Sequence, residues 1–201
     1  MKQALKFTVI IALVFFSSKI LHAQNWQFGV NVDLNYATVQ GNGLKNKLNM
    51  GYGGGVWANY AITKRFKFQP ELSLAQYNYT KSDDFDKYYK NDVGRVGANE
   101  KIRVANLNMP LLLRYDIIPW VSVLAGPQIG VAVFKDENLR KDGVSGFKNP
   151  DIGIVGGLQA NLGSVGIFGR FTQGLSDINN VSTKYKWNSQ RVEFGLSLRV
   201  K

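Results

Sequence analysis

Seven charged side chains recur inside stretches that otherwise alternate between apolar and polar residues, and they are the first candidates for chemistry. They are Asp33, Glu71, Arg114, Arg170, Arg191, Glu193 and Arg199. Glu71 and Glu193 could form the acid and base of a hydrolytic site. Carboxylates that lie among arginines stay ionised, however, and make poor general acids. Because buried charges must be paired to be tolerated, we expect these seven residues to form a salt-bridge network that fills an interior.

The chain lacks the residues that several other catalytic and ligand-binding chemistries require. The chain has no cysteine, and its single histidine, His22, lies in the export signal described below. Thiolate chemistry and a histidine base are therefore excluded from the exported chain. The acidic run of Asp83, Asp84 and Asp86 lacks the ligand spacing of a calcium-binding loop. We predict that the protein is not an enzyme and that it holds no cofactor or metal ion.

Glycines recur on the polar faces of several predicted strands, where a phosphate cradle is one hypothesis. The set comprises Gly51, Gly53, Gly55, Gly126, Gly130, Gly153 and Gly157. None of them is followed by the Gly-Lys-Ser/Thr sequence and helix that a nucleotide site requires. In a small barrel, residues without a side chain leave room for long ones opposite, such as Trp57 and Arg170. We expect the glycines to have this structural role.

A targeting segment opens the chain. Lys2 and Lys6 precede an apolar run over residues 7–16, and Ala23 offers a small residue for cleavage. This pattern is typical of a secretory signal peptide, so we assign residues 1–23 to the signal and residues 24–201 to one exported domain. The formal net charge of the whole chain is +11 at pH 7. A basic exported protein is expected to meet lipid phosphates rather than nucleic acid.

Strict alternation of apolar and polar residues marks the strands that must position the charged side chains. It is clearest from Arg191 to Val200, where one face is aliphatic and the other carries charges. The eight predicted strands are 27–36, 49–62, 66–80, 101–116, 120–134, 151–162, 165–175 and 191–200. Their connections alternate between long and short, as in barrels with short turns at the periplasmic end. The predicted fold is all-β: an eight-stranded antiparallel up-and-down transmembrane β-barrel.

We predict that the aliphatic faces contact lipid and that the charged faces point inward. On the first and last strands the lipid-facing set would be Phe28, Val30, Val32, Leu34, Val192, Phe194, Leu196 and Leu198. Aromatic residues near strand ends predict girdles at the two membrane interfaces. The girdle set is Tyr36, Tyr52, Tyr60, Phe66, Phe68, Tyr79, Tyr115, Trp120, Phe134 and Trp187.

Two local features disturb the predicted strands. The alternation in residues 101–116 changes phase, which predicts a β-bulge near Ala105. Pro70, Pro110 and Pro127 lie inside predicted strands, where a proline cannot donate a hydrogen bond. Each proline therefore implies a bulge or a lost bond between strands.

Basic residues dominate the long loops, which would lie outside the cell. The set comprises Lys45, Lys47, Lys87, Lys90, Arg140, Lys141, Lys184 and Lys186. Two roles stay open for them: binding the phosphates of outer-membrane lipid and lipopolysaccharide, or keeping the loops solvated.

One predicted strand resembles a known family. Residues 108–115, Asn-Met-Pro-Leu-Leu-Leu-Arg-Tyr, are similar to the strand "x-I-P-L-L-L-K-Y" of PorT-like outer-membrane β-barrel proteins of Bacteroidetes. Gly126-Pro127 followed by Gly130 resembles the next strand of that family, and residues 151–158 resemble a later one. The resemblance spans most of the exported chain and accounts for Pro110 and Pro127. It implies an integral barrel in the bacterial outer membrane.

Three functions follow from these observations. The first is a monomeric outer-membrane barrel with a plugged polar lumen and a structural or interaction role, which includes an accessory part in envelope secretion or assembly. The second is a soluble periplasmic barrel of the lipocalin type, which would need an apolar interior and a polar exterior. The third is a lipid-modifying outer-membrane enzyme, for which the serines have no evident base.

Overall fold

The structure is a computed structural model that describes residues 26–89, 101–135, 146–181 and 184–200. The predicted signal peptide and the loop residues Lys90, Arg140 and Lys141 lie outside the described residues. Within the described ranges, no helix combines the length and the hydropathy needed to cross a membrane.

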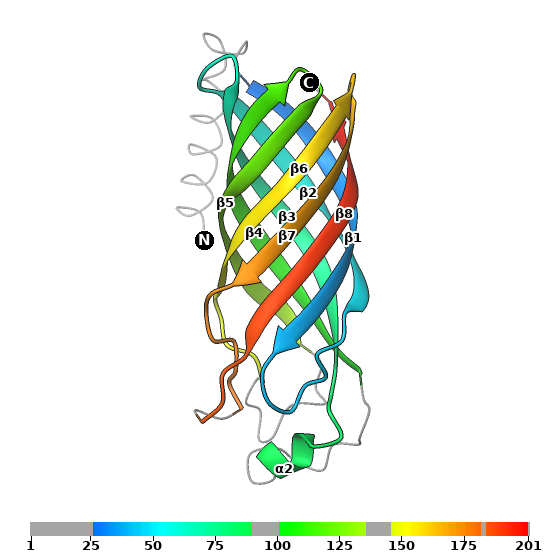
Figure 1. Ribbon diagram of the computed structural model, residues 1–201, viewed down its shortest axis with the longest axis vertical. Coiled ribbons are helices and arrows are strands. Elements are labelled where there is room, and N and C mark those ends of the chain that lie inside the picture. The colour runs from blue at the N-terminus through cyan, green and yellow to red at the C-terminus, as the bar shows by residue number, and fades with distance from the viewer. Residues whose placement is uncertain (1–25, 90–100, 136–145, 182–183, 201) are drawn as a thin grey trace, which may run out of the picture.

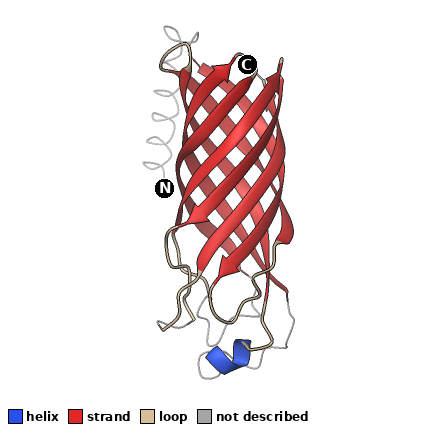
Figure 2. Cartoon of the chain, viewed as in Figure 1, coloured by secondary structure: helices blue, strands red, loops and turns tan. Residues whose placement is uncertain are grey.

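Eight antiparallel strands form one closed barrel, which confirms the predicted fold (Figures 1 and 2). Each strand pairs with its neighbour in the chain, and the first pairs with the last. The strands are β1 (Trp26–Gln40), β2 (Asn49–Ala61), β3 (Phe66–Thr80), β4 (Lys101–Ile118), β5 (Val121–Lys135), β6 (Asp151–Leu162), β7 (Val165–Gly174) and β8 (Asn188–Arg199). Closure leaves no free strand edge for another chain to pair with.

The two ends of the barrel differ in the length of the connections between strands. Short turns join β2 to β3, β4 to β5 and β6 to β7, and β8 ends beside them at the top of Figure 1. The long loops gather at the opposite end. One of them carries the short helix α2 (Phe85–Tyr89), whereas the predicted fold is all-β. A single five-residue turn is too short to show helical periodicity.

The alternation in the sequence becomes a difference between the two faces of the wall. Val32 is 60% exposed on the outside, whereas its neighbour Asn31 is 5% exposed on the inside. The whole predicted lipid-facing set lies on the outer surface, and only Val192 in it is half-buried. An exterior covered by large apolar residues does not favour a soluble barrel of the lipocalin type.

Strand boundaries agree with the sequence pattern best where turns or loops are sharply marked. The structure has β3 and β6 over the predicted residues. β1 and β8 are longer than predicted, because Val39 and Gln40 continue the pairing with Ser189 and Asn188. The predicted bulge is confirmed, since the register between β4 and β5 shifts between Ala105 and Asn106.

The three strand prolines lie in a row across neighbouring strands. Pro70 of β3 pairs with Leu111, next to Pro110 of β4, which in turn pairs with Gln128, next to Pro127 of β5. Each proline has a pairing partner on the following strand of the barrel. The pairing with the preceding strand is interrupted at the proline. The missing N–H groups therefore all fall on the same side of their strands.

The interior has two different halves. Toward the long loops it is an apolar core that contains Ala37, Val39, Tyr77, Tyr79, Ile102, Val104, Phe147, Ile178 and Trp187. Toward the short turns it is lined by polar and charged side chains. Tyr79 and Trp187 are 4% and 0% exposed, so their assignment to the outer aromatic girdle is wrong. Both side chains project into the barrel and its loop end, where ring packing determines their burial.

Candidate functional site

Glu71 and Arg170 join opposite walls of the barrel in the middle of the lumen. Arg170 Nη1 donates to Glu71 Oε2 at 2.7 Å, and Nη2 donates to Oε1 at 2.8 Å. The carboxylate also accepts from Asn31 Nδ2 at 3.2 Å and from Gln69 Nε2 at 2.6 Å. The guanidinium lies over the ring of Phe168, 4.3 Å from its centroid. A fork-to-fork pair with further donors is the geometry that makes buried charges tolerable.

Glycine makes room for this pair. A Cβ atom on Gly157 would lie 2.7 Å from Arg170 Cγ and 2.6 Å from the carbonyl oxygen of Gly169. Neither distance is compatible with a side chain at this position. This agrees with the structural role expected for the inward glycines.

Two further carboxylates lie in the same part of the lumen. Glu193 is the register partner of Arg170 on β8, and Asp33 lies opposite Gly195 on β1. Among the described residues, neither carboxylate has a cation within ion-pair distance. All three carboxylates lie around Arg170, and Glu193 also interacts with Arg191, so carboxylates outnumber arginines in the middle of the lumen.

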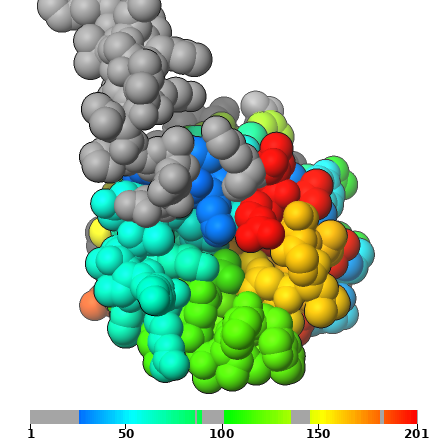
Figure 3. Space-filling view, turned by 90° about the horizontal axis from the view of Figure 1, so that it is seen from above, coloured from blue at the N-terminus to red at the C-terminus, as the bar shows by residue number. Residues whose placement is uncertain are grey.

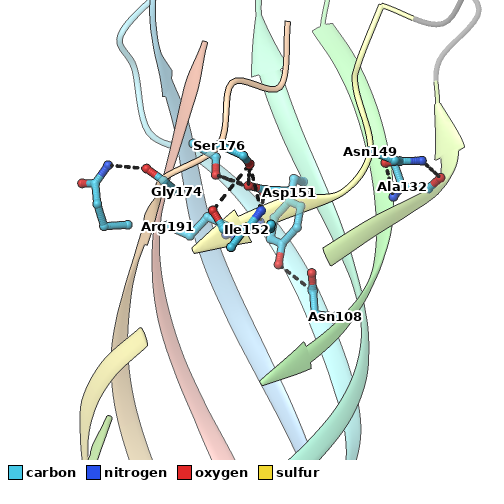
Figure 4. Close-up of polar contacts among 11 residues, drawn as sticks. Asn108, Ala132, Asn149, Asp151, Ile152, Gly174, Ser176 and Arg191 are labelled. Carbon is cyan, nitrogen blue, oxygen red and sulfur yellow. Dashed lines mark hydrogen bonds and ion pairs between the residues drawn. The ribbon is translucent and has the colours of Figure 1, made fainter. Parts of the chain in front are cut away.

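A second pair lies closer to the long loops (Figure 4). Arg191 Nη1 donates to Asp151 Oδ2 at 3.0 Å, and Ser189 Oγ lies within 3.2 Å of both carboxylate oxygens. The guanidinium stacks 4.8 Å from the centroid of the Tyr77 ring. Asp151 is not among the residues predicted from the sequence, although its alternation with Ile152 and Ile154 indicates an inward side chain.

A third group lies at the short-turn end. Asp116 accepts from Arg114 Nε at 3.0 Å and from Ser122 Oγ at 2.7 Å, and Lys67 Nζ lies 2.7 Å from its other oxygen. The predicted network is therefore three separate groups at different heights. Arg199 belongs to none of them, because it is the last residue of β8 and its exposed side chain donates to the carbonyl of Gly163 at 3.3 Å.

The long-loop end is closed by contacts among all four loops. Tyr89 Oη and Trp187 Nε1 both donate to the carbonyl of Asn42, at 3.0 and 3.1 Å. Asn179 Nδ2 donates to Tyr89 Oη at 3.3 Å, and Phe147 pairs with Asn179 through a β-bridge. Burial raises the pKa of Tyr89, which keeps its hydroxyl protonated and available as a donor.

Five of the predicted basic loop residues are described, and they lie in the loops of this closed end. Lys47, Lys87, Lys184 and Lys186 are exposed, and Lys45 is half-buried with its Nζ 3.4 Å from Asp83. Asp83 remains largely exposed. Within the described parts of the chain, no cluster of acidic or histidine side chains has the arrangement of a metal site.

Comparison with known proteins places this architecture in a family. A comparison with curated proteins finds no match. Among solved structures, the barrel is similar to Neisserial surface protein A, with a TM-score of 0.53 and 14% identity over 85% of this chain and 96% of that one. It is also similar to Ail, the attachment invasion locus protein of Yersinia pestis, in complex with the heparin analogue sucrose octasulfate. That match has a TM-score of 0.52 and 13% identity over 88% of this chain and 99% of Ail.

These likenesses agree on the fold, and the sequence itself matches a family model. The model for the outer membrane protein beta-barrel domain matches residues 22–180, which is most of the chain. With an apolar outer wall and a charged interior, the chain is suited to the outer membrane. The protein belongs to the family of outer membrane proteins with this β-barrel domain.

Proposed function

We propose that this outer-membrane barrel is a non-catalytic, monomeric interaction protein whose basic long-loop end binds anionic groups at the cell surface. The phosphates of lipopolysaccharide and other outer-membrane lipids are the proposed partners. The closed loop end supports this proposal most directly, because its interlocked loops hold Lys47, Lys87 and Lys186 at the surface around a blocked lumen. Several basic residues on one rigid surface bind polyanions more strongly than dispersed ones.

The interior gives no support to transport or catalysis as the main role. Glu71 and Arg170 cross the lumen, and the apolar core fills the half of the barrel toward the long loops. The relative Ail was solved with a sulfated heparin analogue, which makes sulfated polysaccharides a second class of polyanion to test on this chain. A place in the PorT-like branch, and with it an accessory part in envelope secretion or assembly, rests on the strand over residues 108–115.

The test is a titration of the purified full-length protein in nanodiscs with lipopolysaccharide and, separately, with heparin. The variant K47E/K186E reverses two charges at the long-loop end, and K64E/R65E reverses two at a short turn. Each basic residue near an anionic surface contributes about 1 kcal/mol, so the loop variant is expected to bind at least roughly tenfold more weakly. Equal affinity of both variants, or an affinity of the native protein that does not fall with added salt, would contradict the proposal.

A companion measurement addresses conduction. The native protein in planar bilayers is expected to produce no stable ion-channel steps, because side chains block the lumen at two heights. Regular steps of fixed conductance would favour a channel over an interaction barrel.

A further inference from the structure

The short-turn end of the barrel holds a polar cavity that the proposed function does not use. Its volume is about 270 Å³, and the turns after β4 and β6 contribute to its lining through Pro119, Gly163 and Ser164. Figure 3 views this end of the barrel from above. Lys67, Arg114 and Arg199 line the cavity together with the single acidic residue Asp116. We call it the short-turn vestibule. In outer-membrane barrels short turns face the periplasm, so the vestibule would be reached from that side.

The vestibule carries an excess of positive charge. Asp116 is shared by Lys67 and Arg114, and its remaining hydrogen bond comes from Ser122. Arg114 contacts Asp116 through Nε, and its two terminal nitrogens make no hydrogen bond to another described residue. Within the described part of the chain, the hydrogen bond of the Arg199 side chain goes to a carbonyl group and not to a carboxylate. Two cations therefore remain uncompensated around the cavity, and arginine forks match the oxygens of carboxylates and phosphates.

Unpartnered amide groups indicate that the ligand carries hydrogen-bonding groups in addition to its charge. Asn59 is 1% exposed and lines the cavity, yet neither its Nδ2 nor its Oδ1 has a hydrogen-bond partner among the described residues. Gln159 Oε1 and Asn161 Nδ2, in the same lining, are also unpartnered. Buried amides without partners are costly, so they indicate a group that completes them. Together they offer both donors and acceptors, which suits the hydroxyl groups of a sugar-like molecule.

We propose that the short-turn vestibule binds a small hydroxylated anion of the sugar-acid or sugar-phosphate class from the periplasmic side. Arg114 and Arg199 bind the anionic group, and Asn59 exchanges hydrogen bonds with the hydroxyl groups. The site is at the opposite end of the barrel from the basic loops. Its existence is therefore independent of the proposed surface function.

The experiment is an NMR titration of the full exported chain in detergent micelles with four probes: gluconate, glucose 6-phosphate, inorganic phosphate and glucose. Saturable shifts of residues around the vestibule are expected with gluconate or glucose 6-phosphate, with a Kd of about 1 mM or tighter. Comparison of these two probes separates carboxylate from phosphate recognition. Inorganic phosphate is expected to bind more weakly, and glucose is expected not to saturate.

Three variants connect the binding to this cavity. N59L replaces the unpartnered amide with an apolar side chain of the same branching and number of heavy atoms, and it is expected to fold normally while weakening binding about tenfold or more. R199Q is expected to weaken it about threefold or more. R103Q makes the same charge change on the outer face near the long loops and should leave the affinity unchanged. Absence of saturation at ten times the expected Kd, or equal weakening by R103Q, would overturn the proposal.

A water-filled vestibule makes a different prediction. In that case no probe would give saturable NMR shifts, and N59L would differ from the native protein only in stability. Because the titration measures binding directly, a failure here leaves the lipopolysaccharide titration of the loop variants unaffected.

Discussion

Glu71 of β3 and Arg170 of β7 form a two-bond salt bridge across the barrel, although 99 positions separate them in the chain. The strands that carry them are not neighbours in the sheet. The bond is therefore a strut between opposite walls. Its two side chains are 1% and 5% exposed, so water screens it little.

Removal of one charge from this strut should destabilise the barrel strongly. In E71Q the guanidinium of Arg170 loses its bidentate partner, and breaking a buried pair typically costs about 3–5 kcal/mol. The measurement is the free energy of unfolding in urea with the protein in lipid vesicles. E193Q is the matched control, since it removes a carboxylate from the same layer that has no ion-pair partner among the described residues. We expect E193Q to be as stable as the native protein or more so, and a loss equal to that of E71Q would contradict the charge balance described here.

Neighbouring glycines provide a test of the space around the strut. In G157A the new methyl group would meet the Gly169 carbonyl at 2.6 Å and Arg170 Cγ at 2.7 Å, so overpacking should cost about 1–3 kcal/mol. Gly156 is the control, because a Cβ atom there has no neighbour within 4 Å. G156A should unfold at the same urea concentration as the native protein.

The outer wall should reject charge in a way that depends on depth. Leu196 is 52% exposed in the middle of the aliphatic face of β8. L196R is expected to reduce the folding free energy by about 2–4 kcal/mol if this face lies in the bilayer, whereas V200R near the end of the chain should cost about 0–1 kcal/mol. Heat-modifiable gel mobility after folding into vesicles reports the folded fraction. Normal folding of L196R would show that this face does not contact lipid.

The aromatic closure of the loops should be separable from the barrel itself. Trp187 is fully buried, donates to the Asn42 carbonyl and lies edge-on to Tyr89 at 5.7 Å. W187A should cost about 3–5 kcal/mol of loop packing and speed up proteolysis at the long-loop end, while the strands stay protected. W120A removes an indole that is 55% exposed and should leave loop proteolysis unchanged. Cleavage within the strands of W187A would instead mean that loops and barrel unfold together.

Much of the fold is encoded locally and could be predicted from the sequence. Two-residue alternation defines which side chains point outward, and the phase change in β4 identified the bulge at Ala105. Pairing partners across the lumen could not be predicted in the same way. The stagger between strands sets the height of each residue, and a sequence pattern gives no measure of that stagger. For this reason the sequence predicts one network where the structure has three separate groups.

The errors share a second cause at the ends of the strands. Trp187 and Tyr79 were assigned to the outer girdle because they lie near strand ends, where aromatic residues usually face lipid. Tyr79 continues the inward register of β3, whose bounds are as predicted, and Trp187 lies in the loop directly before β8. Both rings therefore join the apolar core at the long-loop end. Arg199 shows the converse, since a residue in the inward register becomes exposed where the strand stops.

The row of Pro70, Pro110 and Pro127 has a mechanical consequence. Around each of the three, the backbone pairing with the preceding strand is interrupted. The missing hydrogen bonds therefore lie along one line across neighbouring strands instead of being scattered over the barrel. A barrel wall that lacks inter-strand hydrogen bonds along one line is expected to bend at that line first. Lateral pressure from a compressed bilayer would thus be relieved by bending β3, β4 and β5 together, while the opposite wall, formed by β7, β8 and β1, keeps its curvature.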